Sequence, residues 1–168
     1  NLTEVNEALP IGHGQTISQP LVVAFMLELL QPKVGDKILD VGYGSGYTSA
    51  ILGKIVLEKG KVVAIEVVPE IAEFGKINIA KYNFIEKGIV QCFTADGSKG
   101  YEKEAPFDKI LASASASTLP LAFKEQLKVG GKIVTPIGNS IWSFEKKDEN
   151  NFEEKEYPGF AFVPLIEK

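Results

Sequence analysis

Three alternating glycines in the first third of the chain constrain its fold most. The segment Asp40-Val-Gly-Tyr-Gly-Ser-Gly46 follows the apolar pair Ile38-Leu39. Glycine adopts positive φ without strain and lets a backbone lie against a ligand, because it has no Cβ. The pattern predicts a buried strand that runs into a ligand-binding loop at Gly42, Gly44 and Gly46. The alternative is an ordinary strand-to-helix turn, which glycines also mark.

The spacing of these glycines differs from that of the dinucleotide-binding fingerprint. In that fingerprint the third glycine comes one residue later, and the loop holds a pyrophosphate. Asp40 is a second difference, because a carboxylate at the end of the strand repels phosphate. It can instead hold, directly or through water, the cationic amino group of a ligand such as S-adenosylmethionine. Both features disfavour a nicotinamide oxidoreductase.

The composition is that of one domain with a continuous core. The chain has 168 residues, 45% of them hydrophobic, and its 18 basic and 22 acidic residues give a net charge of −4. This balance argues against a broad phosphate-binding face, so we expect no nucleic-acid partner. The most apolar helical stretch, residues 21–30, is about half as long as a bilayer span, so we expect no membrane partner. Residues 1–168 are predicted to form a single domain that acts as a monomer.

Cysteine content and the start of the chain give two further expectations. Cys92 is the only cysteine, so neither an intramolecular disulfide nor a cysteine-based zinc site can form. We therefore expect a reducing, cytoplasmic setting and no metal. The chain begins at Asn1 and shows no signal peptide, which leads us to expect that part of an N-terminal region is missing.

Apolar runs alternate with helical patterns along most of the chain. Strands are predicted at residues 37–41, 61–65, 89–94, 107–112 and 131–136, and helices at residues 20–30, 47–57, 69–82 and 119–127. This alternation implies a Rossmann-like, doubly wound α/β fold with a mostly parallel sheet. Residues 141–144 and 157–163 predict an antiparallel C-terminal edge hairpin, which makes seven strands. The charged residues 145–156 between them are predicted to be its solvated tip.

Ligands of open α/β sheets bind beyond the carboxyl ends of the strands, so residues that follow each strand are candidates. Glu66 follows the second strand and can accept hydrogen bonds from both ribose hydroxyls of a nucleoside. Asp96-Gly97 follows the third strand, and its carboxylate can accept a hydrogen bond from an adenine amino group. Each also has a structural explanation, since acidic residues favour helix N-termini and Asp-Gly is a common turn. Their joint placement favours a cofactor that contains adenosine.

The segment before the first helix, residues 9–20, is rich in glycine and hydroxyl groups and is expected to lack regular structure. Gln15, Thr16 and Ser18 offer neutral donors and acceptors that can orient a carboxylate. Ser18 also suits the N-cap of the helix that follows. His13 is the only histidine, and its place between two glycines is more typical of a loop residue than of a catalytic base.

Short motifs are spread over almost the whole chain. They are Leu9-Pro-Ile-Gly-His-Gly-Gln-Thr-Ile-Ser-Gln-Pro20, Leu39-Asp-Val-Gly-Tyr-Gly-Ser-Gly-Tyr47, Ala95-Asp-Gly97, Ala105-Pro-Phe-Asp108, Gln126-Leu127 with Gly130-Gly131, Pro136-Ile-Gly138 and Phe162-Val-Pro-Leu165. Together they closely resemble the protein-L-isoaspartate O-methyltransferase family. The glycine loop alone is typical of the wider class of S-adenosylmethionine-dependent methyltransferases, whereas the first and last motifs are more specific.

The resemblance implies the class I methyltransferase fold and a protein repair activity. The implied reaction methylates the free carboxylate of L-isoaspartyl residues in proteins or peptides. S-adenosyl-L-methionine is the implied cofactor, S-adenosyl-L-homocysteine its product, and no metal takes part. Ser18 matches the family's active-site serine. The predicted cofactor site consists of Gln15, Thr16, Asp40, Gly42, Gly44, Gly46, Glu66, Val67, Asp96 and Gly97.

The sequence departs from the family at three places. Little is present of the N-terminal region whose helices help to cover the site. Leu21 stands where members commonly have histidine or another ring residue, and residues 113–117 replace a stretch that is richer in alanine in relatives. This segment contains Ser113, Ser115 and Ser117, which are as typical of a plain strand-to-helix loop as of a substrate contact. The departures bear on substrate affinity more than on cofactor binding.

The implied reaction needs no general base, because a carboxylate with a pKa of about 4 is ionised at neutral pH. We expect an in-line displacement in which Ser18 donates a hydrogen bond that aims the substrate carboxylate. Two alternatives stay open, a methyltransferase for another acceptor and a cofactor-binding homologue without turnover. A nucleic-acid base is a disfavoured acceptor, because residues 112–118 contain neither the aromatic nor the amide groups that hold an extruded base.

Overall fold

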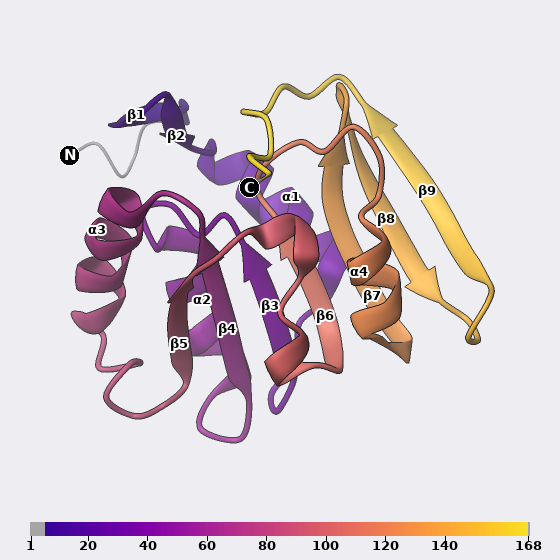
Figure 1. Cartoon of the computed structure of the whole chain (residues 1–168), viewed down its shortest axis with the longest axis horizontal. Coiled ribbons are helices and arrows are strands. Elements are labelled where there is room, and N and C mark those ends of the chain that lie inside the picture. The colour runs from indigo at the N-terminus through magenta and orange to yellow at the C-terminus, as the bar shows by residue number, and fades with distance from the viewer. Residues whose placement is uncertain (1–5, 168) are drawn as a thin grey trace.

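A mixed sheet forms the centre of the protein, whose computed structural model describes residues 6–167. Its strands are β3 (Lys37–Val41), β4 (Lys61–Glu66), β5 (Val90–Thr94), β6 (Phe107–Ala112), β7 (Leu127–Ile137), β8 (Ser140–Lys146) and β9 (Phe152–Pro158). Their order is β5-β4-β3-β6-β7-β8-β9 (Figure 1). The first five in this order are parallel, whereas β8 and β9 pair in the antiparallel sense. The predicted seven-stranded α/β sheet with its antiparallel edge is therefore confirmed.

Helices cover both faces of this sheet (Figure 1). They are α1 (Pro20–Leu30), α2 (Tyr47–Val56), α3 (Pro69–Ala80) and α4 (Leu121–Gln126). Residues of α1, α2 and α3 pack with Ile38 in one buried cluster, whereas Phe123 of α4 belongs to a second cluster that contains Leu39. Successive side chains of a strand point to opposite faces, so Ile38 packs against the helices on one face of the sheet and Leu39 packs on the other face. None of the helices within residues 6–167 is long and apolar enough to span a bilayer.

The expectation that residues 9–20 lack regular structure is wrong. They form a small hairpin of β1 (Leu9–Gly12) and β2 (Gln15–Ile17) before α1 begins. The two residues between these strands, His13 and Gly14, both have positive φ, 52° and 72°. That backbone suits a two-residue hairpin turn, whose twist matches the twist of the paired strands. Figure 1 shows the hairpin above the carboxyl ends of the central strands.

The C-terminal hairpin differs from the prediction in its tip and in its last strand. β9 begins at Phe152, so only residues 147–151 form the tip, and several predicted tip charges lie on an edge strand. Charged side chains on an edge strand oppose pairing with another chain. The predicted strand at residues 157–163 ends at Pro158, because Gly159 turns the backbone with φ +96°. Residues 160–167 run back to the carboxyl edge of the sheet (Figure 1).

The observed bounds of α4 and the first residue of β7 also differ from the predicted ones. The helix covers residues 121–126 rather than 119–127, because Pro120 stands at its N-cap with an extended backbone. β7 begins at Leu127 rather than at Gly131. Leu127 pairs with Phe107 of β6 before the register shifts, so the strand starts directly where the helix stops.

Candidate functional site

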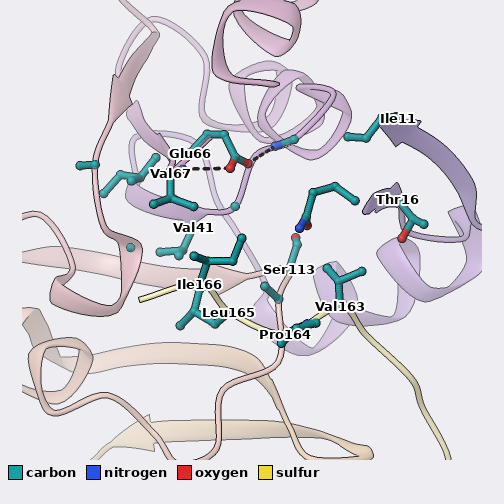
Figure 2. A pocket seen from close by; sticks show the side chains of 17 residues that line it. Ile11, Thr16, Val41, Glu66, Val67, Ser113, Val163, Pro164, Leu165 and Ile166 are labelled. Carbon is teal, nitrogen blue, oxygen red and sulfur yellow. Dashed lines mark hydrogen bonds between the residues drawn. The ribbon is translucent and has the colours of Figure 1, made fainter. Parts of the chain in front are cut away.

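The segments that follow four parallel strands meet in one pocket at the carboxyl edge of the sheet (Figure 2). Its lining from these segments is Gly42 and Gly44 after β3, Glu66 and Val67 at the end of β4, Ala95 and Gly97 after β5, and Ser113 and Ala114 after β6. β3 lies between β4 and β6, so the connections on its two sides diverge at this point of the sheet. Such a point is where open α/β sheets bind their ligands.

Two segments from outside the parallel sheet close this pocket. The β1–β2 hairpin contributes Ile11, Gln15 and Thr16, and the C-terminal segment contributes residues 163–166. Figure 2 shows Ile166 beside Val41, with Leu165 and Pro164 on the side away from Glu66. The volume is only about 40 Å³, whereas ligand pockets generally hold roughly 300–1,000 Å³. A nucleoside therefore requires movement of side chains that line the pocket.

The predicted glycines of the loop have two different tasks. Gly42 and Gly44 have φ of +77° and +51° and line the pocket, so their missing side chains leave space there. Gly46 is not among the lining residues and forms the N-cap of α2 with φ +84°. A Cβ on Gly46 would lie 2.6 Å from Cγ1 of Ile79 in α3. Gly46 thus serves close packing beneath the loop.

Glu66 is held in place by three backbone N–H groups and is only 6% exposed. Its Oε2 accepts a hydrogen bond from Gly44 N at 3.2 Å, and its Oε1 accepts from Val67 N at 2.9 Å and from Val68 N at 3.1 Å. Figure 2 shows this carboxylate at the wall of the pocket with Val67 beside it. A carboxylate oxygen can accept more than one hydrogen bond, so Glu66 keeps capacity for a ligand hydroxyl.

Asp40 lies beneath the loop and is not among the residues that line the pocket. It is fully buried, and its Oδ2 accepts a hydrogen bond from Ser49 Oγ of α2 at 2.5 Å. Burial raises the pKa of Asp40 to about 6, and nearby Glu66 adds to the rise. Its Oδ1 has no hydrogen-bond partner among the described residues. Since buried polar atoms are nearly always paired, this oxygen is suited to a water or an ammonium group.

Asp96 organises the turn after β5. Its Oδ1 accepts hydrogen bonds from Ser98 N at 3.0 Å and Ser98 Oγ at 2.7 Å, and its Oδ2 forms an ion pair with Lys99 at 2.9 Å. These contacts stabilise the short 3-10 helix η2 (Gly97–Lys99). Gly97 lines the pocket, whereas Asp96 is not among its lining residues. A side chain on Gly97 would overlap Cγ1 of Val41, so glycine lets η2 lie against the end of β3.

Ser18 lies outside the first pocket and lines two cavities that adjoin it. One contains Ser18 together with Gly42 and Gly44 of the loop, and the other is a wider cleft against α1. Thr16 and Ser113 line all three spaces, so the spaces are neighbours.

The suggested capping role of Ser18 is wrong. The N-cap of α1 is Gln19, which makes no side-chain capping bond. Asn6 instead accepts a hydrogen bond from Leu21 N with its Oδ1, at 3.1 Å. The Ser18 hydroxyl is therefore not needed to cap α1.

Sequence reasoning missed several residues of the lining. Ser113 is predicted only as a substrate contact or a plain loop residue. It follows β6 directly, so the rule that ligands bind beyond the strand ends, applied to β6, would have assigned it to this pocket. Ile11 and residues 163–166 reach the pocket only through the hairpin and the returning C-terminus, which no local pattern predicts. Among the described residues, no group of three or more His, Cys, Asp and Glu side chains is arranged to hold a metal ion.

Comparison with known proteins gives a consistent assignment. A sequence model of the family "Protein-L-isoaspartate(D-aspartate) O-methyltransferase" matches residues 3–168. The protein-L-isoaspartate O-methyltransferase of Methanopyrus kandleri is 44% identical over 166 residues, which are 96% of this chain and 73% of that protein. Protein-L-isoaspartate O-methyltransferase 2 of Archaeoglobus fulgidus is 45% identical over 168 residues, which are 98% of this chain and 75% of that protein.

The fold leads to the same family. A crystal structure from Plasmodium falciparum, assigned as a protein-L-isoaspartate O-methyltransferase and solved with S-adenosyl-L-homocysteine, superimposes with a TM-score of 0.89 at 27% identity. The match covers 98% of this chain and 82% of that one. Sequence and fold agree along nearly the whole chain, and the chain belongs to the protein-L-isoaspartate(D-aspartate) O-methyltransferase family.

Proposed function

We propose that this chain methylates the free carboxylate of L-isoaspartyl residues in damaged proteins and peptides, with S-adenosyl-L-methionine as the methyl donor. One observation carries the proposal: Ser18 and the glycine loop line the same cavity, which adjoins the pocket that contains Glu66. The Ser18 hydroxyl, a hydrogen-bond donor, therefore lies beside the place where one end of an adenosyl cofactor would lie. Family membership supports the same reaction.

The lining residues fit such a cofactor. Glu66 offers carboxylate oxygens to ribose hydroxyls, and Gly42 and Gly44 leave room for the ligand beside the backbone. Beneath the loop, Asp40 keeps a buried oxygen without a partner among the described residues, which suits a water that bridges it to the cationic amino group of a methionine moiety. Gln15, Thr16, Val67 and Gly97 complete the proposed contacts. We propose Asp96 and Gly46 as positioning residues of this site.

The proposed mechanism needs orientation rather than acid–base chemistry. When bound, S-adenosyl-L-methionine supplies an activated methyl group, and S-adenosyl-L-homocysteine is released after transfer to a carboxylate oxygen of the substrate. Ser18 donates a hydrogen bond that holds the other carboxylate oxygen and so aims the attacking one. The apolar side chains of Ile11 and Val163 exclude water from the site. Positioning and exclusion of water can lower a barrier by roughly 7 to 11 kcal/mol.

The decisive experiment uses two peptides that differ in one linkage. The purified chain is incubated with labelled S-adenosyl-L-methionine and a peptide with one isoaspartate, beside the same peptide with normal aspartate. Base-labile methyl ester is expected on the isoaspartyl peptide alone. Binding of S-adenosyl-L-methionine without transfer to either peptide would support a cofactor-binding homologue and overturn the proposal.

Three further expectations belong to this proposal. Residues 1–168 form one methyltransferase domain, although residues 1–5 and 168 lie outside the described part of the chain. We expect the domain to act as a monomer. It works in the cytoplasm on isoaspartyl proteins and peptides, with no metal and with neither nucleic acid nor a membrane as partner.

A further inference from the structure

We infer that the cleft against α1 binds an apolar side chain adjacent to the isoaspartyl residue, so that the chain selects substrates by their neighbouring residue. This inference rests on the proposed function and adds a specificity to it. The cleft has a volume of about 430 Å³. That size is within the range of sites that hold small ligands, roughly 300–1,000 Å³.

The chemistry of the lining favours an apolar occupant. The apolar side chains that line the cleft are Ala8, Val22, Phe160, Ala161, Phe162 and Val163. The polar lining consists of neutral groups, and no charged side chain of the described residues is part of it. A charged substrate side chain placed there would lose water without gaining an ion pair, which is unfavourable.

The position of the cleft links it to the proposed reaction. Thr16 and Ser113 line both this cleft and the cofactor pocket, and Ser18 lines the cleft and the cavity beside the glycine loop. A carboxylate aimed by Ser18 therefore lies at the mouth of the cleft. The Cα of the residue before the isoaspartate is about 3.8 Å from the isoaspartyl Cα, and the residue after it is one methylene farther because the chain continues through the side-chain carboxyl, so either neighbour is close enough to reach the cleft.

The C-terminal wall of the cleft is held in place by contacts within the protein. Phe160 stacks on Phe25 of α1, with ring centroids 5.7 Å apart and an interplanar angle of 10°. Ser115 N donates a hydrogen bond to Val163 O at 2.8 Å, and Ser115 O accepts one from Leu165 N at 2.8 Å. A wall that is ordered in advance costs less entropy when a ligand binds. The structure thus supplies a preformed apolar subsite.

The test compares matched isoaspartyl peptides. Either neighbour of the isoaspartate, before or after it, is changed among leucine, glutamate and lysine while all other residues stay constant. At one of the two positions, kcat/KM is expected to be at least tenfold higher with leucine than with either charged residue. Values that differ by less than twofold at both positions would overturn the inference and leave the proposed function intact. No methylation of any peptide would overturn both.

A charge placed in the cleft gives a second, independent readout. Ala161→Lys is expected to lower kcat/KM for the leucine peptide and raise it for the glutamate peptide, with an unchanged Kd for S-adenosyl-L-methionine. Val129→Lys is the matched control, because Val129 is an exposed apolar residue of β7 outside the lining of all three spaces. Equal effects of the two variants on the peptide preference would contradict the subsite.

Discussion

Glu66 at the end of β4 accepts a hydrogen bond from the backbone N–H of Gly44 in the loop after β3, at 3.2 Å. The contact fixes the glycine loop relative to the neighbouring strand before any ligand binds. A hydrogen bond from N–H to a carboxylate is stronger than one between neutral groups, because the acceptor is charged. The same carboxylate is the proposed acceptor for ribose hydroxyls, so loop position and cofactor affinity depend on one side chain.

Glu66→Gln is expected to weaken binding of S-adenosyl-L-methionine by about tenfold or more. The amide presents an NH₂ group in place of one oxygen, so at least one of the three backbone N–H groups loses its acceptor, at roughly 1–3 kcal/mol. Isothermal titration calorimetry measures the Kd. Glu73→Gln, an exposed change on α3, is the control. A Kd within twofold of the unaltered protein would refute the role of Glu66.

Ser18→Ala is expected to lower kcat/KM for an isoaspartyl peptide by about 10- to 100-fold, because a hydrogen bond to a charged group contributes roughly 1.5–3 kcal/mol. Cofactor affinity and melting temperature should change little, since Ser18 does not cap α1. Steady-state kinetics with labelled cofactor measures the effect. Ser117→Ala removes an exposed serine that lines none of the three spaces and should have no effect. Full turnover in Ser18→Ala would eliminate the aiming role.

Asp40 is expected to make the cofactor-free protein less stable as pH rises from 5 to 7. Burial raises the pKa of Asp40 from 3.8 to about 6 in the folded protein. Across this window the folded state binds more protons than the unfolded state, so the free energy of unfolding falls as pH rises. The contribution of this group amounts to about 1 to 2 kcal/mol between pH 5 and pH 7.

Asp40→Asn provides the measurement for this prediction. The variant cannot ionise at this position, so urea titrations at pH 5, 6 and 7 should give a smaller pH dependence of its unfolding free energy. The difference between variant and unaltered protein should grow with pH in favour of the variant. A difference that stays constant over this range would show that Asp40 does not titrate there.

Gly75→Ala is expected to destabilise the protein by about 1 to 2 kcal/mol and to weaken cofactor binding. A Cβ on Gly75 in α3 would overlap the carbonyl oxygen of Gly44 and come within 2.8 Å of Cε2 of Tyr43. Overpacking of this kind costs typically 1–3 kcal/mol, and the higher helix propensity of alanine offsets up to about 1 kcal/mol. Thermal melts and calorimetry measure both effects. Ile77→Ala, on the exposed side of the same helix, should leave the Kd unchanged.

The local pattern of apolar residues was sufficient to predict the central strands of the sheet. The apolar segments 37–41 and 61–65 are buried strands because both faces of the sheet are covered, and continuous apolar runs are typical of that environment. Prediction failed where distant segments decide the conformation. The turn of the β1–β2 hairpin has positive φ at His13 and Gly14, but the hairpin is placed by the pocket that it covers, and β9 carries charges because it lies at an edge.

The amino-acid sequence by itself determined the order of the central strands and helices, the glycine loop and the positions of Glu66 and Asp96 after their strands, because these follow from short-range spacing and composition. Only the tertiary structure decided which residues line the pocket and which lie beneath or beside it. It buries Asp40 beneath the loop, places Ser18 in an adjoining cavity and brings the C-terminal residues 163–166 across the pocket. Such placements depend on which strands are neighbours and where the chain returns, and these long-range contacts leave no local signature in the sequence.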